Sequence, residues 1–318
     1  MSRPLHIILL DINTNIYKYW NISHKQLTNI ISKYGLTNHY PYQLTMECST
    51  IAKLISTANH PNYDESGNTA VVSPTNSLSY MGGGYDKFLL QALMLPTSTN
   101  GLDYKPLESK IQEHSLNKFS GYLSVGTIHN INLSDTLDVN KFKNKLAYQN
   151  WKVTNLIQIP SMMVPESLNH SSQHIQKLIG VFDCVWNLLI LLHESHNSHI
   201  ANVIIPGIGS GYGELSEQEI GKIMIFAILL YNLNLGHGDR LLHLKKSCMI
   251  LFFFRKNYRK LSNVYDLEEL ERDVITEYGK KIMIENSEHD NNEHNDKDDF
   301  NEHFTMEFEE LFQCINLQ

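Results

Sequence analysis

Two stretches of this sequence decide its fold: residues 70–90, AVVSPTNSLSYMGGGYDKFLL, and residues 202–220, NVIIPGIGSGYGELSEQEI. Each runs from a short apolar segment typical of a buried strand, through a glycine-rich loop, to the start of a helix. In open α/β sheets, ligands bind beyond the carboxyl ends of the strands, where such loops lie. The two stretches therefore predict an α/β sheet with a binding site built from both loops.

The chemistry of these loops suits a ligand with two phosphates. Glycine lets backbone N–H groups approach a phosphate without a Cβ in the way, and a following helix N-terminus adds favourable partial charge. The second loop alternates as GxGxGxG from Gly207 to Gly213, which is neither the GxGxxG of dinucleotide-binding proteins nor a P-loop. Glycine turns after strands are also common as plain connections, so the prediction depends on the pairing of two such loops.

The rest of the chain alternates strand-like runs with helical patterns, which favours α/β architecture. The expected strands are 5–10, 70–73, 122–128, 156–160 and 202–206, and the run 249–254 is either a sixth strand or a buried helix segment. The expected helices are 85–95, 172–193 and one that begins after the capping box 216–219. Together they predict a three-layer α/β/α domain with a mixed central sheet over residues 1–280, with an insertion loop around 57–68.

The net charge of −8 is concentrated at the end of the chain. Eight acidic residues lie between Glu285 and Glu302 against Lys297 alone, while the preceding residues carry nearly equal numbers of acids and bases. Specific binding to nucleic acid is not expected, because it needs a dense basic surface. Residues 281–318 are expected to be an acidic, largely disordered tail, in which 304–317 could form a short amphipathic helix.

Cysteine and histidine spacing gives no sign of a structural metal or a cofactor. The four cysteines are far apart in the sequence, which predicts neither a zinc knuckle nor a disulfide framework. His193, His196 and His199 could bind a metal, but their polar neighbours favour a helix end and a loop. The N-terminal apolar run is too short for a signal peptide, and no unbroken apolar run spans a membrane. We therefore expect an intracellular protein, cytoplasmic or nuclear, without membrane contact or cofactors.

The ordered motifs resemble those of the macro domain family. Residues 71–86 resemble its segment with an asparagine shortly before a glycine triplet and an aspartate just after, and residues 203–213 resemble its second phosphate loop. Residues 121–127 and 159–165 look like segments of one divergent, macro-like branch. The resemblance spans residues 5–235 and implies a macro fold that binds ADP-ribose or a derivative.

The resemblance also implies roles for the residues that match these motifs. Asn76 would hydrogen-bond the distal ribose, and the triplet of Gly82, Gly83 and Gly84 would line that ribose and the adjacent phosphate. The residues that would surround the diphosphate are Gly207, Ile208, Gly209, Ser210, Gly211 and Tyr212. Tyr212 would lie near the distal ribose, and Ser73 is also assigned to the ligand site. Asp11 is the candidate contact to the adenine amino group, and its alternative role is to cap the following helix.

Some macro domains hydrolyse ADP-ribose 1''-phosphate, which requires a positioned water and a group that handles protons. Asn76 and Asp86 are the candidate catalytic residues, although Asp86 could instead only compensate the dipole of the helix it begins. Several phosphatase-like members have a histidine directly before the glycines, where this chain has Met81. The implied function is ADP-ribose binding with phosphatase activity. The alternatives are a non-catalytic reader of ADP-ribosylated proteins and a structural module that has lost its ligand.

Overall fold

The computed structural model describes residues 4–61, 63, 67–96, 104–136, 142–167, 174–194, 199–235, 239–282 and 305–317. The chain forms two compact units. The first comprises residues 1–23 and 40–231, and the second comprises residues 24–39 and 232–318. Most of the expected acidic tail, including the segment from Glu285 to Glu302, lies outside the described residues.

The first unit is built around a six-stranded sheet with the order β3-β1-β7-β4-β6-β5. Its strands are β1 (Leu5–Asp11), β3 (Tyr42–Cys48), β4 (Asn68–Ser73), β5 (His129–Asn132), β6 (Val153–Gln158) and β7 (Ile200–Ile205). All neighbours are parallel except β5, which pairs antiparallel with β6. The carboxyl ends of the five parallel strands therefore meet at one edge of the sheet, which is where both glycine loops begin.

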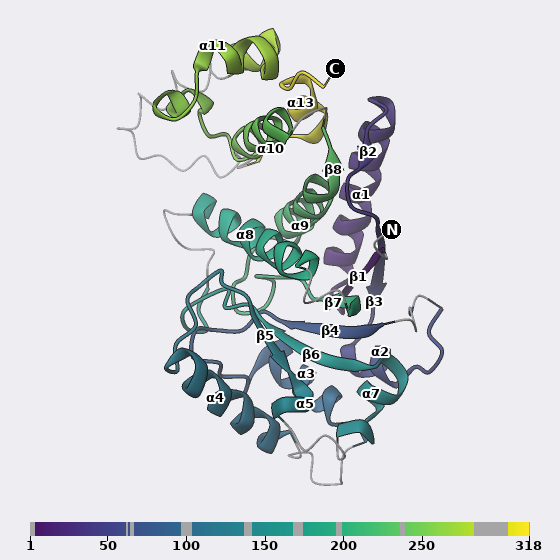
Figure 1. The fold of residues 1–318 in the computed structure, drawn as a ribbon. Helices are drawn as coiled ribbons and strands as arrows, with labels where there is room; N and C mark the ends of the chain where they lie inside the picture. The colour runs from purple at the N-terminus through teal and green to yellow at the C-terminus, as the bar shows by residue number, and fades with distance from the viewer. Residues whose placement is uncertain are drawn as a thin grey trace. The chain divides into compact units, whose positions relative to one another are not determined.

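Helices cover both faces of this sheet, so its central strands are nearly continuous apolar runs. The helices α2 (Ile51–Ser56), α3 (Gly84–Leu93) and α7 (Leu146–Trp151) pack together on one face, and α8 (His174–His193) and α9 (Glu217–Asn232) lie on the other (Figure 1). The indole of Trp151 is fully buried and donates a 2.9 Å hydrogen bond to the carbonyl of Leu54, which joins α7 to α2. The predicted three-layer α/β/α class with a mixed sheet is confirmed.

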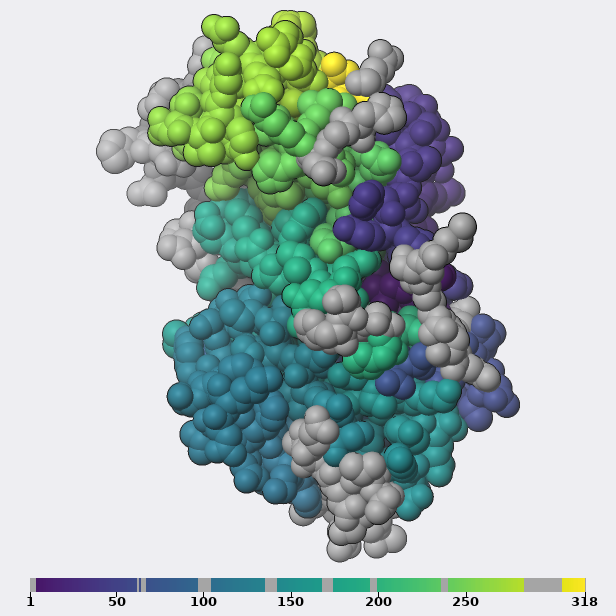
Figure 2. Space-filling model, viewed as in Figure 1, coloured from purple at the N-terminus to yellow at the C-terminus, as the bar shows by residue number. Residues whose placement is uncertain are grey.

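Two further helices complete the layer that contains α3. They are α4 (Lys105–Phe119) and α5 (Leu133–Thr136), and α5 contacts both β5 and β6. Figure 2 shows residues from this part of the chain, in blue, as a closely packed surface of the first unit. Leu107 and Ile111 of α4 are fully buried in the same apolar cluster as α2, α3 and α7.

The strand predicted at residues 122–128 is wrong, because this segment is a loop and the strand β5 begins only at His129. Gly121 and Gly126 have φ angles of +78° and +80°, which interrupt an extended backbone. The N–H groups of Leu123 and Gly126 donate to the carbonyls of Ser77 and Pro160, which lie in other loops. The segment therefore bridges loops rather than strands.

The structure also decides two expectations from the sequence, which concern the run 249–254 and the helix after the capping box. The run 249–254, left open between strand and helix, belongs mostly to the helix α10 (Asp239–Phe253). Helix α9 begins after Ser216, whose hydroxyl accepts from the N–H of Glu219 at 3.5 Å, as the capping box predicts. The edge strand β3 was not predicted.

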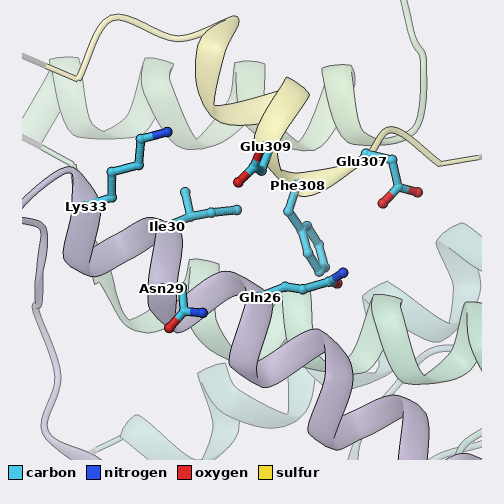
Figure 3. Close-up of a pocket in the computed structure, with 7 residues that line it drawn as sticks. All are labelled: Gln26, Asn29, Ile30, Lys33, Glu307, Phe308 and Glu309. Carbon is cyan, nitrogen blue, oxygen red and sulfur yellow. The ribbon is translucent and has the colours of Figure 1, made fainter.

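The second unit is mainly helical and includes the second half of α1 (Thr14–Lys33), α10 and the C-terminal helix α13 (Phe308–Gln313). Helix α13 lies within the stretch that the sequence marked as amphipathic. Phe308 stacks on Phe253 with ring centroids 6.1 Å apart, and the N–H of Met306 donates to the carbonyl of Phe253. A pocket of about 410 Å³ is lined by residues of α1 and α13 and by Glu307. Figure 3 shows Phe308 directed toward Gln26 in this pocket. The C-terminal residues thus complete the core of this unit.

The remaining elements of the second unit are β2 (Thr37–Asn38), β8 (Leu233–Asn234), η2 (Tyr258–Asn263), α11 (Leu267–Glu269) and η3 (Leu270–Val274).

Helix α8 is the one described helix that is long and apolar enough to cross a membrane, judged by length and composition alone. The core helix of a globular domain passes the same test. Eight side chains of α8 are buried: Leu178, Val181, Phe182, Cys184, Val185, Leu188, Leu189 and Leu192. Burial of these side chains is expected for a helix that covers one face of the sheet.

Candidate functional site

A cleft of about 790 Å³ lies at the carboxyl edge of the sheet in the first unit. Residues of both glycine loops line it, including Asn76, Gly83 and Gly84 from the first loop and the stretch from Gly209 to Gly213 from the second. Further lining residues follow the other parallel strands: Asp11 and Ile12 after β1, Ser49 to Ala52 after β3, and Ser161, Met162 and Pro165 after β6. The two loops therefore face one shared groove, which is the arrangement that the paired motifs predict.

The two loops come into contact through Tyr212. A Cβ added to Gly83 would lie 2.7 Å from the hydroxyl of Tyr212, and one added to Gly84 would lie 3.3 Å from its ring. Gly84 also has a φ angle of +55°, which glycine adopts without strain. Positions 83 and 84 of the first loop therefore require glycine, because the ring of Tyr212 lies against them. More than half of the Tyr212 side chain is exposed, which leaves it free to move against a ligand.

The second loop is a tight turn built on Gly209. This residue has a φ angle of +88°, and a Cβ there would lie 2.8 Å from the side chain of Leu215. The N–H of Leu215 donates to the carbonyl of Gly209, and the hydroxyl of Ser210 donates 2.9 Å to the carbonyl of Gly207. These internal bonds fix the shape of the loop, from which Gly207 and residues 209–213 line the cleft.

Asn76 shapes the first loop with its own amide group. Its Oδ1 accepts from the N–H groups of Leu78 and Tyr80, and its Nδ2 donates 2.8 Å to the carbonyl of Tyr80. The side chain is 5% exposed and still has a second Nδ2 hydrogen. Asn76 thus holds the loop in place while keeping one donor for a ligand at this end of the cleft.

The residue before the glycine triplet, Met81, is buried in the apolar cluster. Its N–H donates 3.2 Å to the carboxylate of Glu108, which is itself paired with Lys105 at 2.7 Å. The thioether accepts from the side chain of Gln158 at 3.7 Å. Position 81 therefore anchors the loop and contributes no side chain to the lining of the cleft.

Asp86 lies in the first turn of α3 and lines the cleft, but its carboxylate is almost fully buried. The hydroxyl of Ser73 donates 2.7 Å to its Oδ1. Burial raises the pKa of Asp86 to about 6, and the hydroxyls of Ser73 and Thr75 act in the opposite direction. A carboxylate with a pKa this close to neutrality is suited to accept a proton and release it again.

Asp11 uses both of its carboxylate oxygens for backbone groups. Oδ1 accepts from the N–H of Asn13 at 2.9 Å, and Oδ2 accepts from the N–H of Gly207 at 3.2 Å. Burial raises its pKa, and the hydrogen bonds from the backbone lower it. The first bond closes a turn before α1 and does not cap the helix, because α1 is capped by Asn13, whose Oδ1 accepts from the N–H of Asn15 at 2.9 Å. The second ties the glycine loop to the end of β1, so Asp11 supports the cleft whether or not it contacts a base.

Three residues assigned to the ligand from the sequence are absent from the cleft lining. Ser73 lies behind Asp86, and the side chain of Ile208 is fully buried in the core. Gly82 precedes the part of the triplet that lines the cleft, and the ring of Tyr80 lies against it. The assignment of these three residues to the ligand is therefore corrected, because none of them lines the cleft. Ser73 instead hydrogen-bonds the lining residue Asp86, and Ile208 packs in the core.

The end of the cleft beside α2 was not predicted from the sequence, because it follows the unpredicted strand β3. This end is lined by Ser49, Thr50 and Ile51 after β3, and by Phe88 and Leu95 from α3 and the residues that follow it. Phe88, which lies in α3, is 61% exposed and therefore offers a large apolar surface. Its place at the mouth of a cleft suits contact with an aromatic ring.

Within the described ranges, no group of three or more His, Cys, Asp or Glu side chains is placed to hold a metal ion. His196, one of the three histidines weighed as ligands, lies outside these ranges.

The comparison with known protein families agrees with the geometry of the cleft. The model of the macro-like domain family matches residues 2–274, which extends beyond the 5–235 covered by the motifs and includes part of the second unit. At the level of the family, this match supports ADP-ribose binding. The chain belongs to the macro-like domain family.

Proposed function

We propose that this chain binds ADP-ribose or a derivative in the cleft and hydrolyses ADP-ribose 1''-phosphate to ADP-ribose and phosphate. The observation that carries the proposal is that both glycine loops and the first turn of α3 line one cleft. The first N–H groups of a helix have no acceptor within the helix, and its N-terminus carries partial positive charge. The described lining contains no Lys, Arg or His. A diphosphate would therefore be held by backbone N–H groups.

The two ends of the cleft differ in character, which supports an orientation for the ligand. The family resemblance assigns Asn76 to the distal ribose, and Asn76 lies at the end lined by Ser161 and Met162. The nucleoside would then lie at the opposite end, where the exposed ring of Phe88 offers apolar surface to a base. In this orientation the diphosphate crosses between the loops, beneath Tyr212.

Asp86 is the proposed base for the hydrolysis. In its ionised form it would take a proton from a water molecule as that water attacks the phosphorus of the 1''-phosphate. The bond between phosphorus and the oxygen on C1'' would break, and this oxygen would leave with the sugar and take a proton from solvent. With a pKa of about 6, Asp86 is mostly ionised at neutral pH and becomes protonated in mild acid.

Calorimetric titration with ADP-ribose and a phosphate-release assay with ADP-ribose 1''-phosphate test both parts of the proposal. We expect binding by the wild type and by Asp86→Ala, but phosphate release by the wild type alone. Asp183→Ala, on the exposed side of α8, is the matched control and should keep full activity. Binding without release by the wild type would leave a reader of ADP-ribosylated proteins. No binding at all would leave a structural module.

A further inference from the structure

Three loops meet at the Asn76 end of the cleft and are joined by backbone hydrogen bonds. The N–H of Ser77 donates to the carbonyls of Met162 and Met163, and the N–H of Leu123 donates to the carbonyl of Ser77. The N–H of Gly126 donates 2.8 Å to the carbonyl of Pro160. The loops 74–80, 122–127 and 160–165 therefore form one surface, which we call the rim platform.

The rim platform exposes large apolar side chains. They are Leu78 (55% exposed), Tyr80 (54%), Tyr122 (45%), Val125 (49%), Met163 (54%) and Val164 (43%). Six of the fifteen large apolar side chains exposed among the described residues thus belong to three short loops. Clustered exposure of this kind marks an interaction surface, whereas single exposed apolar residues are ordinary.

None of the three loops contains a charged residue. A nucleic acid needs basic groups for its phosphates, and a charged small molecule gains nothing from an apolar surface. Leu, Met, Val and Tyr side chains instead match the core of an interface with polypeptide. The platform adjoins the cleft, because Asn76, Tyr80, Met162 and Pro165 line the cleft and also belong to the platform loops.

We propose that the rim platform binds an apolar stretch of polypeptide that carries the ADP-ribosyl group through C1''. This inference rests on the ADP-ribose binding in the proposed function and not on the phosphatase reaction, because a polypeptide on C1'' takes the place of the 1''-phosphate, and the orientation given above directs C1'' of the distal ribose toward the platform. The glycine loops would hold the ADP-ribosyl group, and the platform would select among carriers by the side chains next to the attachment point. Free ADP-ribose would use the cleft alone.

The test is calorimetric titration with three ligands: free ADP-ribose, and two peptides joined to ADP-ribose by a hydrolytically stable linkage. One peptide has leucine and valine beside the attachment point, and the other has serine and glutamine. We expect the wild type to bind the apolar peptide about tenfold more tightly than the polar one. The double variant Leu78→Ser/Met163→Ser should bind both peptides alike, with an unchanged affinity for free ADP-ribose. Val264→Ser, an exposed apolar residue of the second unit, is the control and should behave as the wild type.

The possible outcomes separate this inference from the proposed function. Equal affinity of the wild type for both peptides, with binding of free ADP-ribose intact, would overturn the platform and leave the cleft standing. An equal loss of affinity for free ADP-ribose in the double variant would also overturn it, because these residues would then belong to the cleft. Sedimentation that shows a wild-type dimer, lost in the double variant, would identify a second copy as the occupant and refute a peptide. Failure of free ADP-ribose to bind the wild type would reject the proposed function itself.

Discussion

Replacing Asp86 with asparagine should stabilise this protein while abolishing its hydrolysis of ADP-ribose 1''-phosphate. Burial raises the pKa of Asp86 from 3.8 to about 6, so the folded state binds a proton more tightly than the unfolded state. The ionised carboxylate therefore destabilises the fold above pH 6, and this cost disappears as the pH falls from 6 to below 3.8. This rise in the pKa corresponds to about 3 kcal/mol. Asparagine keeps an oxygen that can accept from Ser73 but carries no charge.

We expect Asp86→Asn to raise the free energy of unfolding by about 2–3 kcal/mol at pH 8, and to leave it nearly unchanged at pH 4. In a domain of this size, the gain at pH 8 corresponds to a rise in Tm of roughly 4–12 °C. Urea unfolding of the wild type and the variant at both pH values measures the difference. Ser73→Ala is the companion variant, and it should lower stability at pH 8 because it removes a donor to the buried charge. An Asp86→Asn variant that is destabilised at pH 8, or changed equally at both pH values, would refute the reasoning.

Four further predictions concern the same cleft. Gly83→Glu should reduce the affinity for ADP-ribose by more than about 100-fold in calorimetric titration, because it places bulk and negative charge where the hydroxyl of Tyr212 would already lie 2.7 Å from a Cβ. The control is Gly180→Ala, whose added Cβ would have no atom within 4 Å and which should leave the affinity unchanged. Gly209→Ala should lower the free energy of unfolding by about 1–3 kcal/mol, because its φ of +88° is strained for alanine, and urea unfolding measures the loss. Asp11→Asn should weaken ADP-ribose binding several-fold in calorimetry, because its one remaining oxygen cannot serve both backbone donors as the carboxylate does. The kcat/KM for phosphate release should rise with pH around a midpoint near 6, as Asp86 ionises, and a flat profile between pH 5 and 8 would argue against this base.

The parts of the fold that followed from the sequence are those in which local pattern and buried position agree. The strands β1, β4, β6 and β7 are almost entirely buried on both faces, so each contains an apolar run that is easily recognised. The edge strand β3 is only partly buried and carries polar residues, so its sequence has no clear pattern. The segment 122–128 alternates like a strand, but Gly126 within it and Gly121 just before it have positive φ angles, which give it the shape of a loop. Long-range hydrogen bonds, which the sequence does not reveal, decide its position.

The same division applies to the candidate site. The glycine loops were recognisable because a positive φ and close contact both demand glycine, as at Gly84 and Gly209. The end of the cleft near Phe88 and Ser49 was not, because it depends on two chain segments brought together by the sheet. The burial of Asp86 could not be predicted either, since aspartate in the first turn of a helix is most often exposed. Its raised pKa arises from its position behind the first glycine loop rather than from its sequence neighbours.

Each glycine loop is held in place by one buried or partly buried carboxylate that accepts a backbone N–H. Asp11 accepts from Gly207 at the start of the second loop, and Glu108 accepts from Met81 just before the first. An anionic ligand needs N–H groups that point into the cleft, and an ionised carboxylate nearby repels it. The ion pair with Lys105 offsets the charge of Glu108. Asp11 accepts a second backbone N–H from Asn13, and burial raises its pKa, which favours its neutral form. The loops can therefore be rigid and still present positive partial charge to a diphosphate, which explains how a cleft whose described lining has no basic side chain can bind an anion.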